Sequence, residues 1–344
     1  MANQILIEKQ AFSLILGKMG NLVVSVCLFP EGNDMNRQLS EYHSRSMQER
    51  QILFSAIIAA CFIISISVFA YQKHMETMRS ACAKQLTSLI KDKCARIADW
   101  RGDRLADAMM LLDSPFFVDA FRNWIADRSE QPTQKMTNRL RIIQLYRNYS
   151  DVMLLDADGK AVFSLSGELS KLENEPARAV SSAIATRMPL LSDLYQRGKD
   201  KTPGMDVIAP ISDRNSERVT LLGAVVLRLD AEKTLYPLIS STAGDKAEIE
   251  TWLIRREEEY AVLLNNPGAN PNSAFTQKCV LSEHTHPAVM AALGGSGFAE
   301  GRDWRGTAVF SSYGQIAGSP WSLAMKMDKS ESLSGWQSQG GLII

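Results

Sequence analysis

Residues 52–71, ILFSAIIAACFIISISVFAY, are twenty consecutive positions without a formal charge. An α-helix needs about 20 mainly apolar residues to cross the hydrocarbon core of a bilayer, so this segment is long enough for one span. A buried core helix is the alternative, but such helices rarely run so far without a charge. No small-residue cleavage site follows, which favours an uncleaved signal anchor over a signal peptide. We expect a transmembrane helix at 51–72.

The flanks of this segment do not decide its orientation. Basic residues precede it at Arg37, Arg45 and Arg50 and follow it at Lys73, Arg79 and Lys84. The positive-inside count is therefore a tie, but long downstream domains are translocated regardless of charge. We expect the large domain after the span to be extracytoplasmic and residues 1–50 to be a weakly ordered cytoplasmic extension. A start at Met47, with the preceding residues a gene-start artefact, is the alternative.

A long amphipathic helix is expected directly after the span. Apolar residues recur at steps of three and four from Met75 to Trp100 and continue to Leu112, which marks one face of a helix. Ser114-Pro115 ends this helix and starts a second, and a third follows around 133–147. The apolar stripe is expected to form the seam of a homodimer, although packing against the chain's own domain would give the same pattern.

After Asn148 the pattern changes from helix to strand. DVMLLDADGKAVFSL (151–165) is two β-rich runs joined by Asp158-Gly159, a dipeptide that suits a tight hairpin. A helix at 176–187 and two strands at 205–212 and 219–230 follow. The same order of helices and antiparallel strands then occurs again up to residue 331. The sequence therefore predicts an α+β fold: a transmembrane helix, a long stalk helix and two PAS-like antiparallel-sheet modules.

A family resemblance rests on three runs of residues. GAVVLRLDAEKTLYPLI, ETWLIRR and HPAVMAALGGSGFAEGRDWRGTAVFSSYGQIAGSPWSLAMKMDKSE resemble the double Cache (dCache) sensor domain of bacterial membrane receptors. The resemblance covers about residues 75–331 and implies an output module of the histidine-kinase or diguanylate-cyclase class beyond this chain. It also implies that GGLII begins a second membrane segment, so that 332–344 is the start of a truncated span. A frayed tail of an intact protein is the alternative.

The resemblance gives the following division of the chain. The segments are an extension at 1–50, a transmembrane helix at 51–72, the sensor domain at 73–331 and the truncated span at 332–344. Within the sensor domain, 73–147 are stalk and packing helices, 148–230 the membrane-distal module and 231–331 the membrane-proximal module. One departure concerns RREEEYAVLL: without a Gly, the turn at Glu257-Glu258-Glu259 must be longer or strained.

Ligand-binding residues are expected in the membrane-distal module, where the resemblance places small-molecule sites. Arg187 could pair with a carboxylate through its planar fork. Asp193 or Asp206 could accept hydrogen bonds from an ammonium group, and Tyr195 could cover a ligand with its ring. The expected ligands are amino acids, carboxylates or amines. A solvated helix end, a turn carboxylate and ordinary core packing are the alternative interpretations of Arg187, Asp193 and Tyr195.

Other classes of function find little in the sequence. The 38 basic and 38 acidic residues cancel, so no net charge attracts nucleic acid. Neither a nucleophile-base pattern nor zinc-type spacing of Cys and His occurs, so no catalytic residue, metal or cofactor is expected. We expect a bacterial receptor that lies in the inner (plasma) membrane and binds a small polar molecule. A protein-interaction module without a small-molecule ligand and a membrane-anchored enzyme remain as alternatives.

Overall fold

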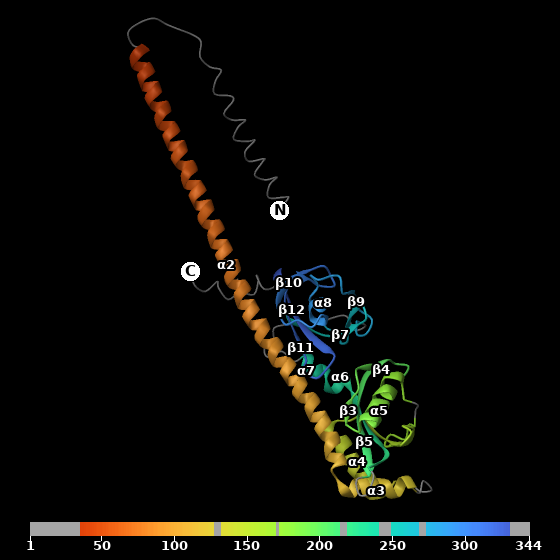
Figure 1. Ribbon diagram of the computed structural model, residues 1–344. Coiled ribbons are helices and arrows are strands. Elements are labelled where there is room, and N and C mark those ends of the chain that lie inside the picture. Colours follow the sequence, from red (N-terminus) through yellow and green to blue (C-terminus); the bar gives the residue numbers. More distant parts are fainter. Residues whose placement is uncertain are drawn as a thin grey trace. The chain divides into compact units, whose positions relative to one another are not determined.

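The fold is described from a computed structural model, which describes residues 35–126, 132–169, 172–213, 219–240, 249–267 and 273–330. The chain divides into two compact units at Met75, and each is described by itself. The expected extension before residue 35 and the expected second span at 332–344 lie outside the described residues. Figure 1 labels the helices and strands by the names used below.

Helix α2 (Met35–Leu112) is the longest element. Residues 35–50, from the expected N-terminal extension, belong to this helix. In the first unit, residues 52–71 are all exposed, including large apolar side chains such as Phe54, Phe62 and Phe69. Within the described part of the chain, α2 is the one helix long and apolar enough to cross a membrane. Its exposed apolar surface is what a lipid-facing helix requires.

In the second unit, two short helices follow α2. They are α3 (Pro115–Ala126) and α4 (Gln134–Arg147). Pro115 occupies the first position of α3, where its missing N–H is no loss. The hydroxyl of Thr133 accepts a hydrogen bond from the backbone N–H of Met136 and so caps the start of α4. Both helices lie close to the positions that the sequence predicts.

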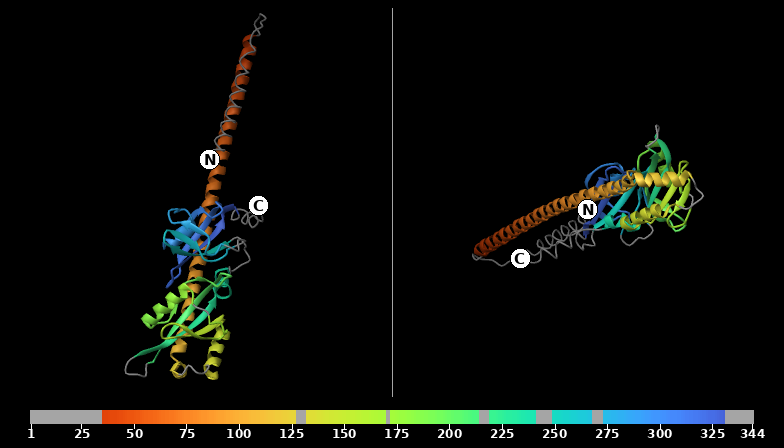
Figure 2. Two further views of the ribbon diagram at one scale, coloured as in Figure 1. Left: turned by 90° about the vertical axis from the view of Figure 1, so that its right-hand side faces the viewer. Right: turned by 90° about the horizontal axis from the view of Figure 1, so that it is seen from below.

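The first sheet belongs to the membrane-distal module of the prediction. Its strands are β1 (Asp151–Asp156), β2 (Ala161–Ser164), β3 (Leu190–Leu191), β4 (Tyr195–Arg197), β5 (Thr202–Asp213) and β6 (Thr220–Asp230). The strand order is β2-β1-β6-β5-β3, with β4 also paired to β5, and every pair is antiparallel. Helix α5 (Asn174–Thr186) lies over one face of this sheet (Figure 2).

The second sheet follows two short helices, α6 (Ala231–Thr234) and α7 (Tyr236–Ser240). Its strands are β7 (Ile249–Glu257), β8 (Tyr260–Leu263), β9 (Lys278–Val280), β10 (Gly297–Arg302), β11 (Ala308–Gln315) and β12 (Trp321–Asp328). The order is β10-β11-β12-β7-β8-β9, again antiparallel throughout, and α8 (Pro287–Ala292) packs on it. The two antiparallel sheets with helices confirm the predicted α+β class.

The turns show how closely local sequence sets the backbone. Gly159 has a φ of 78° in the β1–β2 hairpin, as the Asp-Gly prediction requires. The turn between β7 and β8 contains two residues, and Glu258 there has a φ of 50°. A non-glycine residue in the left-handed region is strained, so the strained form of the two predicted alternatives is the one adopted.

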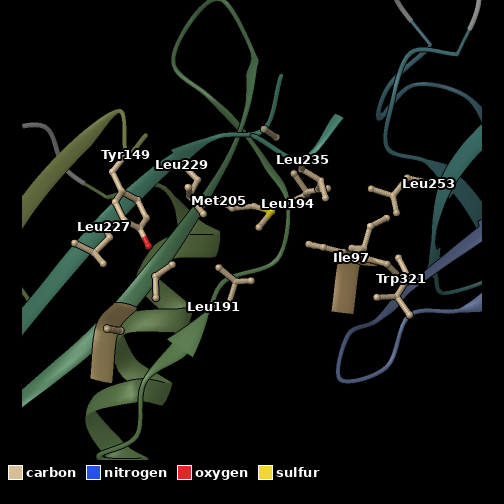
Figure 3. Packing of buried hydrophobic residues seen from close by; sticks show 14 of the residues in the cluster. Ile97, Tyr149, Leu191, Leu194, Met205, Leu227, Leu229, Leu235, Leu253 and Trp321 are labelled. Atoms are coloured by element: carbon tan, nitrogen blue, oxygen red, sulfur yellow. The ribbon is translucent and has the colours of Figure 1, made fainter. Parts of the chain in front are cut away.

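The apolar stripe of α2 packs inside the chain's own domain. Cys82, Leu86, Ile90, Cys94 and Ile97 are buried in the main hydrophobic cluster, which also contains side chains from both sheets. Figure 3 shows Ile97 near Leu253 and Trp321. Of the two interpretations of this stripe, the structure therefore supports packing within the chain, and these side chains are not free to form a dimer seam.

Charged side chains form a buried network at the second sheet, centred on Lys326 of β12. Lys326, only 2% exposed, lies 2.9 Å from carboxylate oxygens of both Asp303 and Asp328. The other carboxylate oxygen of Asp303 accepts hydrogen bonds from the backbone N–H groups of Arg305 and Thr307. All of these residues lie within the third of the three runs that carry the family resemblance. Their mutual contacts give them an architectural role.

Candidate functional site

Three charged residues lie side by side on the face of the first sheet that α5 covers. Arg228 on β6 is the register partner of Asp151 on β1 and of Asp206 on β5. They are 7%, 6% and 0% exposed. Burying charged side chains costs free energy unless they are paired. The neighbouring positions along these strands are apolar, so nothing in the local sequence explains a charge there. A buried row of alternating charge is therefore a candidate for function.

Asp206 is at one end of this row. One of its carboxylate oxygens accepts a hydrogen bond of 2.9 Å from the hydroxyl of Tyr195. The other lies 3.7 Å from Nε of Arg228, which is too long for a hydrogen bond, and neither of these two atoms has another partner in the described part of the chain. Burial raises the pKa of Asp206 to about 6, despite the opposing effect of Arg228.

Asp151, at the other end of the row, accepts hydrogen bonds at both of its carboxylate oxygens. It accepts hydrogen bonds from the hydroxyls of Ser164 at 2.7 Å and Ser166 at 3.0 Å. The backbone N–H groups of Val152 and Ser166 also donate to it. Four donors fix the position of this carboxylate, so Asp151 presents an oriented acceptor group beside Arg228.

An open cleft of about 430 Å³ lies above Asp151 and Arg228. Its other walls come from the residue that caps the start of α5, from the end of β4 and the segment after it, and from the segment after β2. The lining residues are Ser150, Asp151, Ser166, Glu168, Glu173, Arg197, Gly198, Asp200, Thr202 and Arg228. Four carboxylates and two guanidinium groups therefore face one small volume, and the excess of negative charge favours a ligand with a positive group.

Glu173 and Arg197 both line the cleft. Oε1 of Glu173, at the start of α5, accepts a hydrogen bond of 2.9 Å from the backbone N–H of Gly198. Its Oε2 is buried without a partner among the residues described. Arg197 Nη1 donates to the hydroxyl of Ser150 at 3.4 Å, a long and weak bond. Both side chains thus retain capacity to bind a ligand.

None of the four residues predicted from the sequence is among the residues that line the cleft. Tyr195 and Asp206 meet through their hydrogen bond, and Asp206 is the register partner of Arg228, which lines the cleft. Arg187 is exposed at the end of α5, with a φ of 55°, and is not among the lining residues. Asp193 turns away, and its carboxylate contacts Trp321 and Arg255 of the second sheet.

Sequence reasoning missed Asp151, Glu173, Arg197 and Arg228. A signal for Arg228 was present, because it interrupts the apolar run GAVVLRLD in a strand expected to be buried on both faces. Asp151 and Glu173 stand at element starts, where carboxylates are common for structural reasons. Nothing in the sequence pairs them with Arg228, since the pairing comes from strand register.

A larger cavity of about 480 Å³ lies between the β1–β2 hairpin and α5. Aliphatic side chains such as Leu172, Val180 and Ile184 supply most of its lining. It contains none of the buried charged groups described above. The charged cleft combines converging polar groups with buried charged residues in its lining, so we take it as the candidate site.

Comparisons with known proteins bear on the fold. No protein-family model matches the sequence, and no curated protein matches it. Among solved structures, the sensory domain of the Campylobacter jejuni chemoreceptor Tlp3 with isoleucine bound has a TM-score of 0.53 at 13% identity, covering 75% of this chain and 97% of that one. Its ligand-binding domain with L-norvaline has a TM-score of 0.50 at 14% identity, covering 74% and 94%. A further crystal structure of the Tlp3 sensory domain has a TM-score of 0.53 at 15% identity, covering 75% of this chain and 98% of that one.

These similarities show a fold. The sensory domains in question are of the dCache type, so the chain has the double Cache fold that its sequence resembles. Identity of 13–15% does not carry ligand or activity from those proteins to this one.

Proposed function

We propose that this chain is the extracytoplasmic sensing part of a membrane receptor that binds a small polar molecule in the cleft above Arg228. The observation that carries the proposal is the buried row of Asp151, Arg228 and Asp206 under an open cleft. Asp151 and Arg228 of this row line the cleft, and ligands commonly bind where a few buried polar groups converge. The fold of chemoreceptor sensory domains and the apolar part of α2 support the same function.

The charges of the cleft indicate the class of ligand. Glu173, with an unpaired buried oxygen, and the neighbouring carboxylates suit an ammonium group. Arg197 and Arg228 suit a carboxylate or another oxygen acceptor. An amino acid or a small amine with an oxygen acceptor satisfies both sides. The Tlp3 structures carry isoleucine and L-norvaline, which are amino acids, and this supports the choice.

The division of the chain belongs to this proposal. We assign residues 51–72 to a transmembrane helix in the inner (plasma) membrane of a bacterium, with 148–230 and 231–331 as the two modules outside the cytoplasm. The receptor serves no enzymatic role of its own and signals to an output module of the kinase or cyclase class. That the structural neighbours are sensory domains rather than enzymes supports this assignment.

We also propose a homodimer, on a surface other than the buried stripe of α2. Large apolar side chains remain exposed near the end of α2 and on the helices that follow it. The most exposed are Phe116 (89%), Tyr146 (83%) and Leu145 (68%). An exposed apolar group of this size is a common mark of an interface.

A thermal-shift screen tests the proposed function. The full chain in detergent is melted alone and with each of the twenty proteinogenic L-amino acids and a set of small amines. A compound that binds the folded state raises the melting temperature, by RT ln(1 + [L]/Kd) in free energy. Arg197→Met should abolish the shift, because Arg197 lines the cleft. Arg187→Met makes the same chemical change outside the cleft and should leave it intact. A screen without any shift would end the small-molecule proposal and favour a protein-interaction module.

A further inference from the structure

The segment between β3 and β4 contains one residue too many for regular pairing with β5. Leu191 pairs with Val207 and Tyr195 pairs with Gly204, so four steps along the segment match three along β5. Ser192 keeps its backbone N–H bonded to the carbonyl of Asp206. The extra residue makes a bulge, and bulges re-aim side chains near functional sites. Here the bulge points Asp193 toward the second sheet.

Asp193 joins the two sheets through its carboxylate. Oδ1 accepts a hydrogen bond of 2.6 Å from the indole Nε1 of Trp321 on β12. Oδ2 lies 2.9 Å from Nη1 of Arg255 on β7, and the same Nη1 donates to the carbonyl of Leu194. Charge-assisted hydrogen bonds of this kind are stronger than neutral ones and specify geometry. Asp193 in the bulge therefore contacts two strands of the second sheet, β7 and β12.

The contact continues to the long helix. The guanidinium of Arg101 on α2 lies over the ring of Trp321, 4.7 Å from its centroid. Its Nη2 donates to the carbonyl of Gly318 in the β11–β12 turn at 2.8 Å. Trp321 is 1% exposed, so its ring has no freedom to move without its neighbours. Asp193, Trp321 and Arg101 thus form one chain of contacts from the first sheet to α2, which we call the Asp193 relay.

The other end of the same segment forms a wall of the cleft. Arg197 and Gly198 line the cleft, and the backbone N–H of Gly198 is bonded to Glu173. The backbone N–H of Asp193 is bonded to Glu175 at 3.3 Å. Glu173 is the N-cap residue of α5 and Glu175 lies in the first turn of that helix. Cleft and relay are therefore attached to the same turn of α5 by the two ends of one short segment.

We propose that the Asp193 relay reports the occupancy of the cleft to the second sheet and α2. This inference rests on the proposed function. A ligand that engages Glu173 or Arg197 competes with the bond that Glu173 makes to Gly198, and so shifts the segment that carries Asp193. The position of this segment then decides whether the N–H groups of Trp321 and Arg255 still reach the carboxylate of Asp193. In either case Arg255 retains its second carboxylate partner, Glu257. Coupling of this kind is reciprocal, so a change at Trp321 also alters the cleft.

Hydrogen exchange on the full chain in detergent tests the relay without any ligand. Glu173→Gln weakens the hold on Gly198. It should change exchange at residues 316–323, which are the β11–β12 turn and the first three residues of β12, at least twofold. The same substitution in an Asp193→Ala background should leave those residues unchanged. Glu257→Ala is the matched control, because it removes the other carboxylate from Arg255 and leaves the bulge in contact with Trp321. In that background the effect of Glu173→Gln should persist.

Two outcomes overturn the relay. One is that Glu173→Gln in the wild-type background leaves exchange at residues 316–323 unchanged. The other is that Glu173→Gln changes this exchange equally with and without Asp193. If Asp193→Ala does not fold, Trp321→Phe breaks the same contact from the other side and keeps the ring, and the same two outcomes apply.

A ligand arm uses whichever L-amino acid or amine raises the melting temperature. That compound should change exchange at 316–323 in the wild type and in Glu257→Ala, but not in Asp193→Ala, although it still raises the melting temperature of all three. If no compound binds, the proposed function fails while the variant cycle still decides the relay.

Discussion

The carboxylate of Asp193 and the indole nitrogen of Trp321 lie 2.6 Å apart although 128 positions separate them in the chain. Asp193 comes from a bulge beside β5 and Trp321 from the first residue of β12. Their bond links two sheets that the sequence presents as separate modules. The fold is therefore joined by specific polar contacts as well as by the main hydrophobic cluster.

Replacing the indole of Trp321 should cost stability. Trp321→Phe keeps most of the buried ring but removes the N–H that Asp193 accepts, so the free energy of unfolding should fall by about 1 to 3 kcal/mol. Denaturant titration of the full chain in detergent measures it. Trp100→Phe, a half-buried tryptophan on α2 outside this contact, is the control. Equal losses in the two variants would contradict a special role for the bond.

Lys93 should make stability rise in alkali. It is 3% exposed on α2 and its ammonium donates to the carbonyl of Ile239. Burial, and secondarily Arg96, lowers its pKa to about 8. Between pH 8 and its usual value near 10.5, the unfolded chain holds the proton that the folded chain has released, so the free energy of unfolding increases with pH.

Lys93→Met should lack that rise and be more stable than the wild type at pH 7, by roughly 1 to 3 kcal/mol. Denaturant titrations at several pH values between 7 and 10 compare the two. Identical pH slopes would show that Lys93 is not held in the way that the structure indicates.

Asp206 should have the opposite pH dependence. Its folded pKa of about 6 lies above the usual 3.8, so between these values the folded chain binds the extra proton. The free energy of unfolding therefore falls as pH rises from about 4 to 6, and the stabilisation is complete only in acid. Asp206→Asn should flatten this part of the curve. An unchanged curve would mean that burial does not raise the pKa of Asp206 as described.

Two glycines should respond to alanine in opposite directions. A Cβ on Gly223 in β6 would lie 2.1 Å from the carbonyl oxygen of Leu155 on the neighbouring strand. Gly223→Ala should therefore separate β1 from β6 and cost several kcal/mol, in the range of severe overpacking. A Cβ on Gly102, within α2, would meet nothing within 4 Å. Gly102→Ala should stabilise by roughly 0.5 to 1 kcal/mol. Similar melting temperatures for both variants would contradict the packing at Gly223.

Local sequence signals predicted the elements well where the chemistry is local. Asp158-Gly159 predicted a hairpin that is present, and Ser114-Pro115 predicted the boundary between α2 and α3. The stripe of α2 predicted a buried face but not its partner, because packing against a second copy and against the chain's own sheets demand the same spacing. Only the folded domain distinguishes them.

The candidate site was harder to predict because strand register assembles it. Asp151, Asp206 and Arg228 are far apart in sequence and become neighbours only through the β1–β6 and β6–β5 pairings. The prediction placed Asp193 at a ligand, since nothing local reveals a bulge. The extra residue appears only when the pairing with β5 is known. Tyr195 and Asp206 were placed in one segment by the family resemblance, and the structure brings them together.

The most direct test of the account is chemical labelling of the cleft in intact cells. Asp200 is exposed and lines the cleft, so Asp200→Cys places a thiol at its entrance. The reagent is a membrane-impermeant maleimide small enough to cross an outer membrane, and the wild type gives the background from native cysteines. The account predicts labelling without permeabilisation, slowed by the amino acid or amine that raises the melting temperature. Labelling only after the cells are permeabilised would contradict it.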